Sequence, residues 1–424
     1  MNHPHAPDGI QRLIARGDRN QSTVIFGSLD DQLPEDHRAR VVDDAVQGMD
    51  LREFYAEVSS RMQAGGRPAH DPAVLLALWL LATLDGYGSA RELSRLVDEH
   101  IAYRWLAHGS SISYHTLSSF RIDHAEKLDR LLTQMVAALV SEGLVTLERV
   151  AQDGMKVRAS AGAASFHRQP TLAEALQDAE QQVAALAKER DAGVPAGGAR
   201  RLAARERGAR ERRDRLAQAL AKAMALDTQR STADGPVRVS STDPESRVMK
   251  HGDGGFRPSY NVQLATDADS QVIVGVAVTD AGSDLGLAAP MHRQVTERTG
   301  KKPKDYLVDG GFTKHDDIEA LDEAGTRVIA PVPKPKDANR DPHAPRPGDS
   351  PAVAAWRMRM GDAAVKALYH LRAATAECVN ALMRNRGMRA LTVRGQDNAN
   401  TCAIWQVLAH NLMRMAVLRA PATT

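Results

Sequence analysis

Residues 147–153 read LERVAQD, residues 304–311 read KDYLVDGG, and residues 369–387 read YHLRAATAECVNALMRNRG. Each stretch carries one acidic residue on which the fold depends, and these are Asp153, Asp309 and Glu377. Each Asp follows a short run rich in Val and Leu that predicts a strand, and Gly follows each Asp. The Glu lies in a segment typical of a long helix. Two carboxylates at strand ends and one on a helix indicate a metal site.

The three acids are far apart along the chain, so only a fold that lays distant strands side by side can assemble them. A parallel or mixed α/β sheet does this. The predicted strands fall at residues 147–152, 260–265, 272–278, 306–308 and 328–330. Helices are predicted at 285–299 and after residue 313. The order β, β, β, α, β, α, β, α predicts a mixed α/β fold with both Asp residues on the sheet.

The part of the chain before the first strand predicts a bundle of helices. Asp71 and Pro72 open a strongly apolar helix, and Ser89 with Glu92 forms a capping-box pattern at the start of the next one. A turn at Gly109 then leads into a helix over 114–140. Helix, short turn and helix is the arrangement of a helix-turn-helix DNA reader, and ordinary helix packing produces the same spacing.

Composition limits the classes of protein that fit. The 424 residues suffice for two domains, and 43% of them are hydrophobic, which fills a sizeable core. The net charge is only +2, so any surface for nucleic acid has to be local. The two cysteines, Cys378 and Cys402, predict small buried side chains and a reducing cytoplasm. The longest apolar run, 73–82, is about half of the roughly 20 residues that a membrane span needs, so we expect no membrane partner.

Four blocks of sequence carry a family resemblance. DPESRVMKHGDGGFRPSYNVQLATD at 243–267, YLVDGGF at 306–312 and YHLRAATAECVNALMRNRGMRALTVRG at 369–395 resemble the catalytic domain of bacterial insertion-sequence transposases of the DDE type. Residues 66–121 look like the helical N-terminal domain of the same transposases. Three acids in the family's order, within the family's surrounding blocks, make this resemblance specific.

The resemblance implies two domains. A helical N-terminal domain over residues 1–140 would bind the DNA ends, and a ribonuclease-H-like catalytic domain would follow over 141–424. In that domain helices flank a mixed sheet, and a helical insertion at about 169–230 separates the first two strands. Residues 200–215 of the insertion hold eight Arg against three acids. Such a face either contacts DNA phosphates or is simply solvated.

The resemblance also makes Asp153, Asp309 and Glu377 the catalytic residues and the metal ligands. Carboxylate oxygens are the ligands that Mg²⁺ prefers, and two Mg²⁺ ions about 4 Å apart can activate a water and stabilise the leaving 3′ oxygen. We therefore expect two Mg²⁺ ions, for which Mn²⁺ can substitute. Other acids near the strands compete for these roles, namely Asp280, Asp305, Asp316 and Asp317. The last two lie at a predicted helix start, where acids complement the helix dipole.

Five residues are implied to contact DNA: Arg247, Lys250, Tyr369, Arg372 and Arg384. The family pattern is Tyr, two residues, Arg, three residues, Glu, six residues, Lys. Here four residues separate Arg372 from Glu377, and Arg384 replaces the Lys. The spacing leaves open whether Arg372 and Glu377 share a helical face, whereas an Arg still binds a phosphate bidentately. Arg247 and Lys250 fit a surface role equally well.

These observations predict a DNA transposase that cleaves the ends of its insertion element and joins them to target DNA by two-metal-ion phosphodiester chemistry. Its partner would be double-stranded DNA, both element ends and target, bound by a homodimer or higher oligomer in the bacterial cytoplasm, associated with the nucleoid. One alternative is a catalytically silent, transposase-derived DNA-binding protein such as a repressor. Another is a nuclease that only hydrolyses. Assays for metal-dependent cleavage and for joining to target DNA separate these possibilities.

Overall fold

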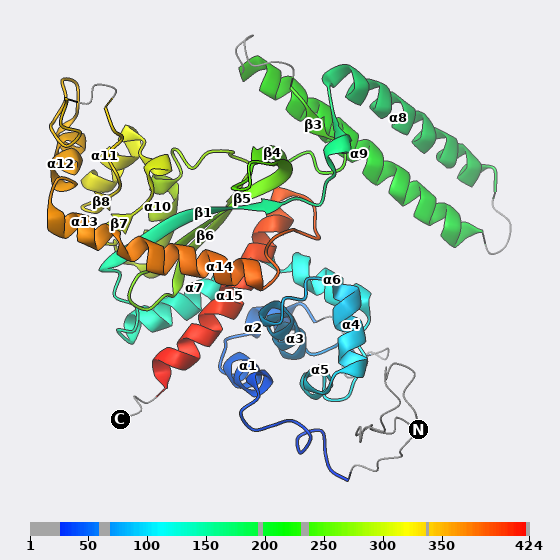
Figure 1. Cartoon of the computed structure of the whole chain (residues 1–424). Helices are drawn as coiled ribbons and strands as arrows, with labels where there is room; N and C mark the ends of the chain where they lie inside the picture. The colour runs from blue at the N-terminus through cyan, green and yellow to red at the C-terminus, as the bar shows by residue number, and fades with distance from the viewer. Residues whose placement is uncertain (1–25, 59–67, 194–197, 230–236, 336–338, 421–424) are drawn as a thin grey trace, which may run out of the picture.

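The computed structural model describes residues 26–58, 68–193, 198–229, 237–335 and 339–420. It contains a mixed sheet flanked by helices, a group of N-terminal helices beside it, and a long helical hairpin that projects from the sheet (Figure 1). The mixed α/β fold class is therefore confirmed. The break in the helical insertion that the sequence GVPAGG predicts around Pro195 lies outside the described residues.

The main sheet has the ribonuclease-H-like order. The strands are β1 (Arg149–Arg158), β2 (Phe166–His167), β3 (Val239–Ser240), β4 (Arg247–Lys250), β5 (Phe256–Asp267), β6 (Ile273–Thr279), β7 (Asp305–Leu307) and β8 (Arg327–Ile329). β1 lies in the middle, with antiparallel β5 on one side and parallel β7 and β8 on the other. β4 and β6 both pair with the far edge of β5. The short pair β2–β3 forms a separate small sheet.

The first strand is longer than its sequence predicts. It was expected to end at residue 152 and to leave Asp153 at its tip, but β1 continues to Arg158. The reason is the long neighbouring strand β5, which pairs with β1 without interruption from Asp267 to Ser259. Asp153 therefore lies in the middle of a strand, and the prediction of a strand-end position was wrong for this residue.

The N-terminal helices are α1 (Arg38–Gln47), α2 (Arg52–Ala56), α3 (Pro72–Leu84), α4 (Ala90–Glu99), α5 (Ile101–Leu106), α6 (Tyr114–Asp123) and α7 (Ala125–Ser141). The predicted caps are present, because the Asp71 side chain accepts a hydrogen bond from the N–H of Ala73 and Ser89 accepts one from Glu92. The single helix predicted over 114–140 is broken at His124 into α6 and α7.

The predicted helical insertion is a hairpin of α8 (Gln169–Asp191) and α9 (Ala199–Gln229). The two helices pack on each other through small apolar clusters of Leu and Ala side chains, separate from the main core. At its base, Lys222 Nζ lies 2.8 Å from Asp280 Oδ2 and fixes α9 to the end of β6. The hairpin thus folds on itself, contacts the sheet through Lys222 near the end of α9, and projects away from it (Figure 1).

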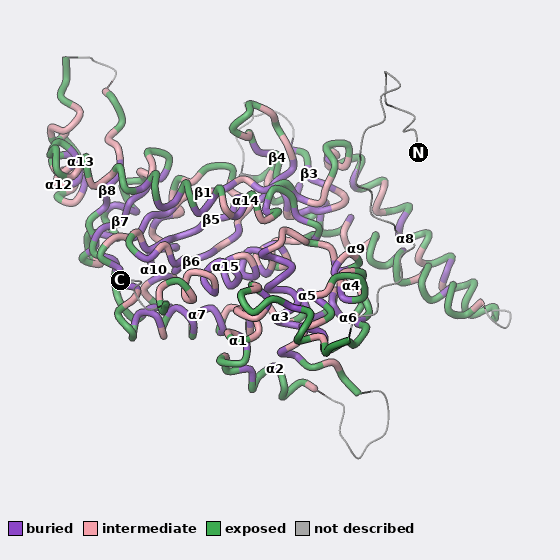
Figure 2. The backbone as a smooth tube through the Cα atoms, turned by 60° about the horizontal axis from the view of Figure 1, so that its bottom comes forward, coloured by how far each residue is buried: buried purple, intermediate pink, exposed green. Residues whose placement is uncertain are grey.

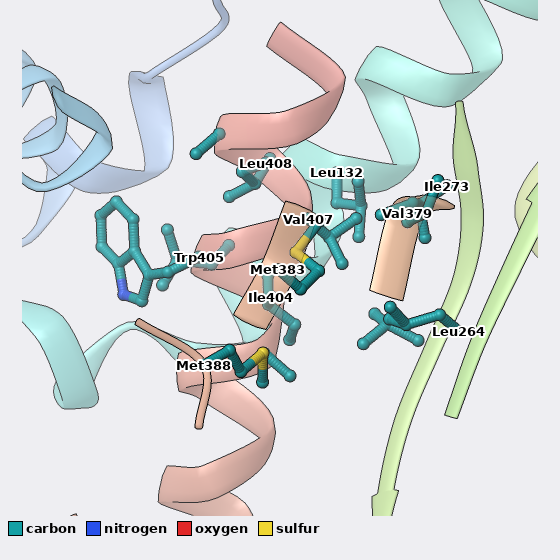
Figure 3. Packing of buried hydrophobic residues seen from close by; sticks show 14 of the residues in the cluster. Leu132, Leu264, Ile273, Val379, Met383, Met388, Ile404, Trp405, Val407 and Leu408 are labelled. Carbon is teal, nitrogen blue, oxygen red and sulfur yellow. The ribbon is translucent and has the colours of Figure 1, made fainter. Parts of the chain in front are cut away.

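The remaining helices are α10 (Ala288–Thr299), α11 (His315–Glu323), α12 (Pro351–Arg359), α13 (Ala363–Tyr369), α14 (Cys378–Asn385) and α15 (Gln396–Arg419), with the short turns η1 (Ala163–Ser165), η3 (Gly310–Phe312) and η4 (Ala373–Glu377). Helix α15 lies between the N-terminal helices and the sheet and packs against both. Its side chains pack against α14 and the sheet, where Met383, Val407 and Ile273 belong to the same cluster (Figure 3). On its other side, Trp405 donates a hydrogen bond to the carbonyl of Arg121 in α6.

One hydrophobic cluster therefore runs from the N-terminal helices through α15 into the sheet (Figure 2). Cys402 packs at its edge, whereas Cys378 is exposed, so the prediction of a buried side chain was wrong for Cys378. Within the described ranges, no helix is both long enough and apolar enough to cross a membrane.

A buried histidine on α15 makes the stability of this core depend on pH. His410 is 1% exposed, and its Nε2 lies 2.9 Å from the carbonyl oxygen of Gln271, so Nε2 is the donor. Its Nδ1 is buried without a hydrogen-bond partner. Protonation would place a charge on that atom, and burial lowers the pKa of His410 to about 4.

We predict that the free energy of unfolding falls as the pH drops from about 6.5 to about 4. In this window the unfolded chain binds a proton at His410 that the folded chain does not, which costs on the order of 3 kcal/mol. Denaturant titrations at several pH values measure this loss. His410→Gln should reduce it, while the exposed His115→Gln control should not. An equal pH dependence in wild type and His410→Gln would contradict the assignment.

Candidate active site

The register of two parallel strands places Asp153 beside Asp309. The last paired residues of β1 and β7 are Ala151 and Leu307. Each Asp follows its paired residue by two positions, so both side chains point to the same face of the sheet. β7 has ended before Asp309, whose Oδ1 accepts a hydrogen bond from the N–H of Gly311 at 2.7 Å. The two carboxylates thus share one end of the parallel pair.

Arg372 joins these carboxylates to the third acid. Its Nη2 lies 2.8 Å from Asp153 Oδ1 and 3.6 Å from Asp309 Oδ2. Its Nη1 lies 3.5 Å from Glu377 Oε1. The Arg372 side chain is buried, 7% exposed as a residue, while Glu377 is largely exposed. The structure therefore brings all three predicted acids together, around one guanidinium.

A π-helical turn gives Arg372 and Glu377 a common face. η4 (Ala373–Glu377) is a π-helix that runs directly into α14. Because a π turn holds more residues than an α turn, residues five apart lie on one face of it, as residues four apart do in an α-helix. This chain has one residue more between Arg372 and Glu377 than the family pattern, and the π turn accommodates it. Arg372 and Glu377 therefore do share a helical face, which the sequence spacing left open.

Sequence reasoning missed two further polar residues near Asp153, of which only Asn380 contacts its carboxylate. The side-chain amide of Asn380 donates to Asp153 Oδ2 at 2.8 Å, so both oxygens of this carboxylate are held. Asp284 lies on the other side of β1, where the amides of Asn261 and Gln263 donate to it at 2.7 Å. The available signal for Asn380 was a polar residue one turn after Glu377 on the buried stripe of α14.

Gly154 has no side chain because this polar group fills the space. A Cβ at position 154 would lie 2.3 Å from Asp284 Oδ1 and 2.4 Å from Gln263 Nε2. The Asp-Gly pair that the sequence suggested as a strand end is therefore a close packing point in mid-strand. It keeps a fourth carboxylate near the site.

Burial and neighbouring charges perturb two groups of the site. Burial raises the pKa of Asp153 above its ordinary value, Arg372 opposes this shift, and Asp309 and Asp284 add to it. Burial also raises the pKa of the Tyr369 phenol, on which Arg372 and Asp309 act as well. Tyr369 is thus a neighbour of the carboxylates, as the family pattern implies.

The other acids considered for the site have different partners. Asp280 pairs with Lys222, and Asp305 pairs with Arg327 at 2.7 Å. Asp316 pairs with Lys314 at 2.9 Å. The side chain of Asp317 accepts a hydrogen bond from the N–H of Ala288 at the start of α10. None of these partners is Arg372. Contact with the Arg372 guanidinium therefore distinguishes Asp153, Asp309 and Glu377 from the other four acids.

Three of the predicted DNA contacts lie outside this group. Arg247 and Lys250 are exposed on β4, and Arg247 lies level with Arg158, five positions beyond Asp153 along the sheet. Arg384 is exposed near the end of α14. The structure therefore brings Tyr369 and Arg372 to the acids but keeps the other three basic residues on the surface.

The donor set of the site fits a divalent cation. Three carboxylates from β1, the end of β7 and η4 converge on one positive group, and oxygen donors of this kind are what Mg²⁺ prefers. As the side chains stand in the described part of the chain, no three acidic, His or Cys residues are close enough together to hold a metal ion. The guanidinium of Arg372 lies among the carboxylates instead.

Comparison with family models gives two matches. Residues 27–123 match the model of a transposase domain, DUF772, and residues 221–412 match the model of the transposase DDE domain. The second match includes Asp309 and Glu377, while Asp153 lies before it. Comparisons with curated proteins and with solved structures gave no match.

A ribonuclease-H-like sheet with three converging acids is the architecture of a polynucleotidyl-transfer enzyme. Both family models match in the expected order, and together they support an insertion-sequence DDE transposase. Members of this family generally use divalent metal ions and act on DNA.

The π turn gives a prediction that distinguishes it from an ordinary helix. Deleting Ala374 should return η4 to an α-helix without rotating α14, so metal-dependent DNA cleavage should stay within about tenfold of the parent. Deleting Ala381 in the regular part of α14 should turn the following residues by about 100° and abolish cleavage. Cleavage assays on both folded variants test this. An equal loss in both would show that the extra residue is itself required.

Proposed function

We propose that this transposase cleaves the ends of its own insertion element and joins the freed 3′ ends to target DNA at a single site. The observation that supports this most is the meeting of Asp153, Asp309 and Glu377 around Arg372. Two-metal phosphodiester chemistry needs acidic oxygens gathered at one point, open to the substrate on one side. Glu377 provides that open side, since it is the most exposed of the three.

The three carboxylates would act as metal ligands, with Asp153 on the sheet, Asp309 just after β7 and Glu377 in the π turn. Bound Mg²⁺ ions would supply the activated water and the stabilised leaving oxygen. The residues of the chain orient the groups. Asn380 holds one oxygen of the Asp153 carboxylate, and the N–H of Gly311 holds one oxygen of Asp309. These contacts fix the directions of both carboxylates before substrate binds.

DNA would approach along a basic surface beside the sheet. A groove of about 610 Å³ at the base of the hairpin is lined by Lys222, Arg238 and Arg247, with Asp280 as its acid. Asp280 pairs with Lys222, and within the described ranges neither Arg238 nor Arg247 forms an ion pair. Such guanidinium groups suit phosphate oxygens. Arg384 would add a further phosphate contact from α14.

The arginines of the hairpin divide into two groups. Arg205 pairs with Glu189 at 3.0 Å across the two helices, so part of the charge is neutralised within the hairpin. Arg207 and Arg212 are exposed and form no ion pair in the described part of the chain. We assign Arg207 and Arg212 to DNA phosphates, because the charge of a guanidinium without an ion pair is not already neutralised by a carboxylate. The N-terminal helices would supply the contacts specific to the element ends.

The test of the proposed function replaces each acid in turn. Asp153→Asn, Asp309→Asn and Glu377→Gln should each reduce metal-dependent cleavage of element-end DNA by at least about a thousandfold, because each removes a charged metal ligand. Binding of the same DNA, measured by fluorescence anisotropy, should remain within a few-fold. Asp316→Asn, an exposed acid at the start of α11, is the matched control and should cleave normally. Normal cleavage by any of the three variants would remove that residue from the site.

A further inference from the structure

A single side chain supplies positive charge to all three carboxylates. Both terminal nitrogens of Arg372 face carboxylates, with Nη2 between Asp153 and Asp309 and Nη1 toward Glu377. Its Nε is buried and has no hydrogen-bond partner. The guanidinium therefore occupies the point at which the three acids converge.

This arrangement competes with a divalent ion for the same oxygens. Both oxygens of Asp153 are already engaged, one by Arg372 at 2.8 Å and the other by Asn380 at 2.8 Å. Mg²⁺ requires oxygens at about 2.1 Å and repels a positive group next to it. A metal ion on Asp153 therefore competes with the guanidinium for this carboxylate, and withdrawal of the guanidinium favours the metal.

The charges make such an exchange feasible. Three carboxylates surround one guanidinium, so two negative charges stay uncompensated, and Asp284 nearby adds a third. The site thus attracts a further cation while Arg372 is in place. Arg372 also has an alternative partner of suitable chemistry, because a phosphodiester accepts a guanidinium as readily as a carboxylate does.

We propose that Arg372 is the internal counter-cation of the metal-free site, and that it leaves the carboxylates when a DNA phosphate binds it. The active site would then be fully open to metal only on DNA. This inference rests on the proposed function, since it assumes that the three acids hold the metal. It gives Arg372 a role in positioning the carboxylates and in controlling metal affinity, beyond a DNA contact.

The test measures metal binding without DNA. Mn²⁺ titrations followed by electron paramagnetic resonance should give Arg372→Gln an affinity at least about tenfold higher than wild type, because a competing positive charge is removed. Lys366→Gln is the matched control, since it removes a positive charge from exposed α13, six residues earlier. It should leave the affinity unchanged. An equal or lower affinity in Arg372→Gln would overturn the proposal.

A second variant and a second readout cover the case in which Arg372→Gln folds poorly without metal. Arg372→Lys keeps the charge but cannot span all three acids with one ammonium group, and it should show a smaller gain in Mn²⁺ affinity. Mn²⁺ should also raise the melting temperature of either variant by more than it raises that of wild type. No gain in either measurement would contradict the proposal.

The Mn²⁺ titrations also distinguish failure of the proposed function from failure of the counter-cation role. If wild type, both Arg372 variants and Asp153→Asn all bind Mn²⁺ equally, or none of them binds it at all, the acids are not the metal ligands. If Asp153→Asn loses Mn²⁺ binding while wild type and the Arg372 variants bind alike, the metal site stands and only the counter-cation role fails.

Discussion

The arrangement of the molecule around its active site depends on one guanidinium held by three carboxylates. Asp153, Asp309 and Glu377 come from a mid-strand position, the end of a short parallel strand and a π turn. Three acids gathered without a cation would repel each other strongly at such distances. Arg372 supplies the missing charge, and it comes from the same helical segment as Glu377. The segment that provides Glu377 thus also provides the positive charge next to Asp153 and Asp309.

The rest of the fold holds that segment in place. Val379 and Met383 of α14 are fully buried. Their side chains pack against α15 and the sheet (Figure 3). α15 in turn packs against the N-terminal helices, where Trp79 and Trp405 lie 6.3 Å apart between ring centres. The segment that carries Arg372 and Glu377 therefore shares one core with the N-terminal helices. Studies of end recognition need the whole chain, because a fragment of the N-terminal helices would expose the surface that α15 covers.

The sequence was informative where a local pattern decides the structure. Val- and Leu-rich runs before Asp153 and Asp309 located the two strands, whereas their parallel pairing is known only from the structure. The full length of β1 could not be predicted, since its second half, after Gly154, is a strand only because β5 runs alongside it. The π turn was also hidden, because one added residue breaks the period of 3.6 on which helix prediction depends. Asn380 and Asp284 gain meaning only from tertiary neighbours.

The most direct measurement is a crystal structure of the protein with element-end DNA and Mn²⁺, in which anomalous scattering locates the metal. We expect manganese peaks at the carboxylates of Asp153 and Asp309, with Glu377 beside them. We also expect the guanidinium of Arg372 to have moved from these oxygens to a DNA phosphate. Manganese bound at other acids, or bound at Asp153 while Arg372 keeps its contact with that carboxylate, would contradict the proposed exchange.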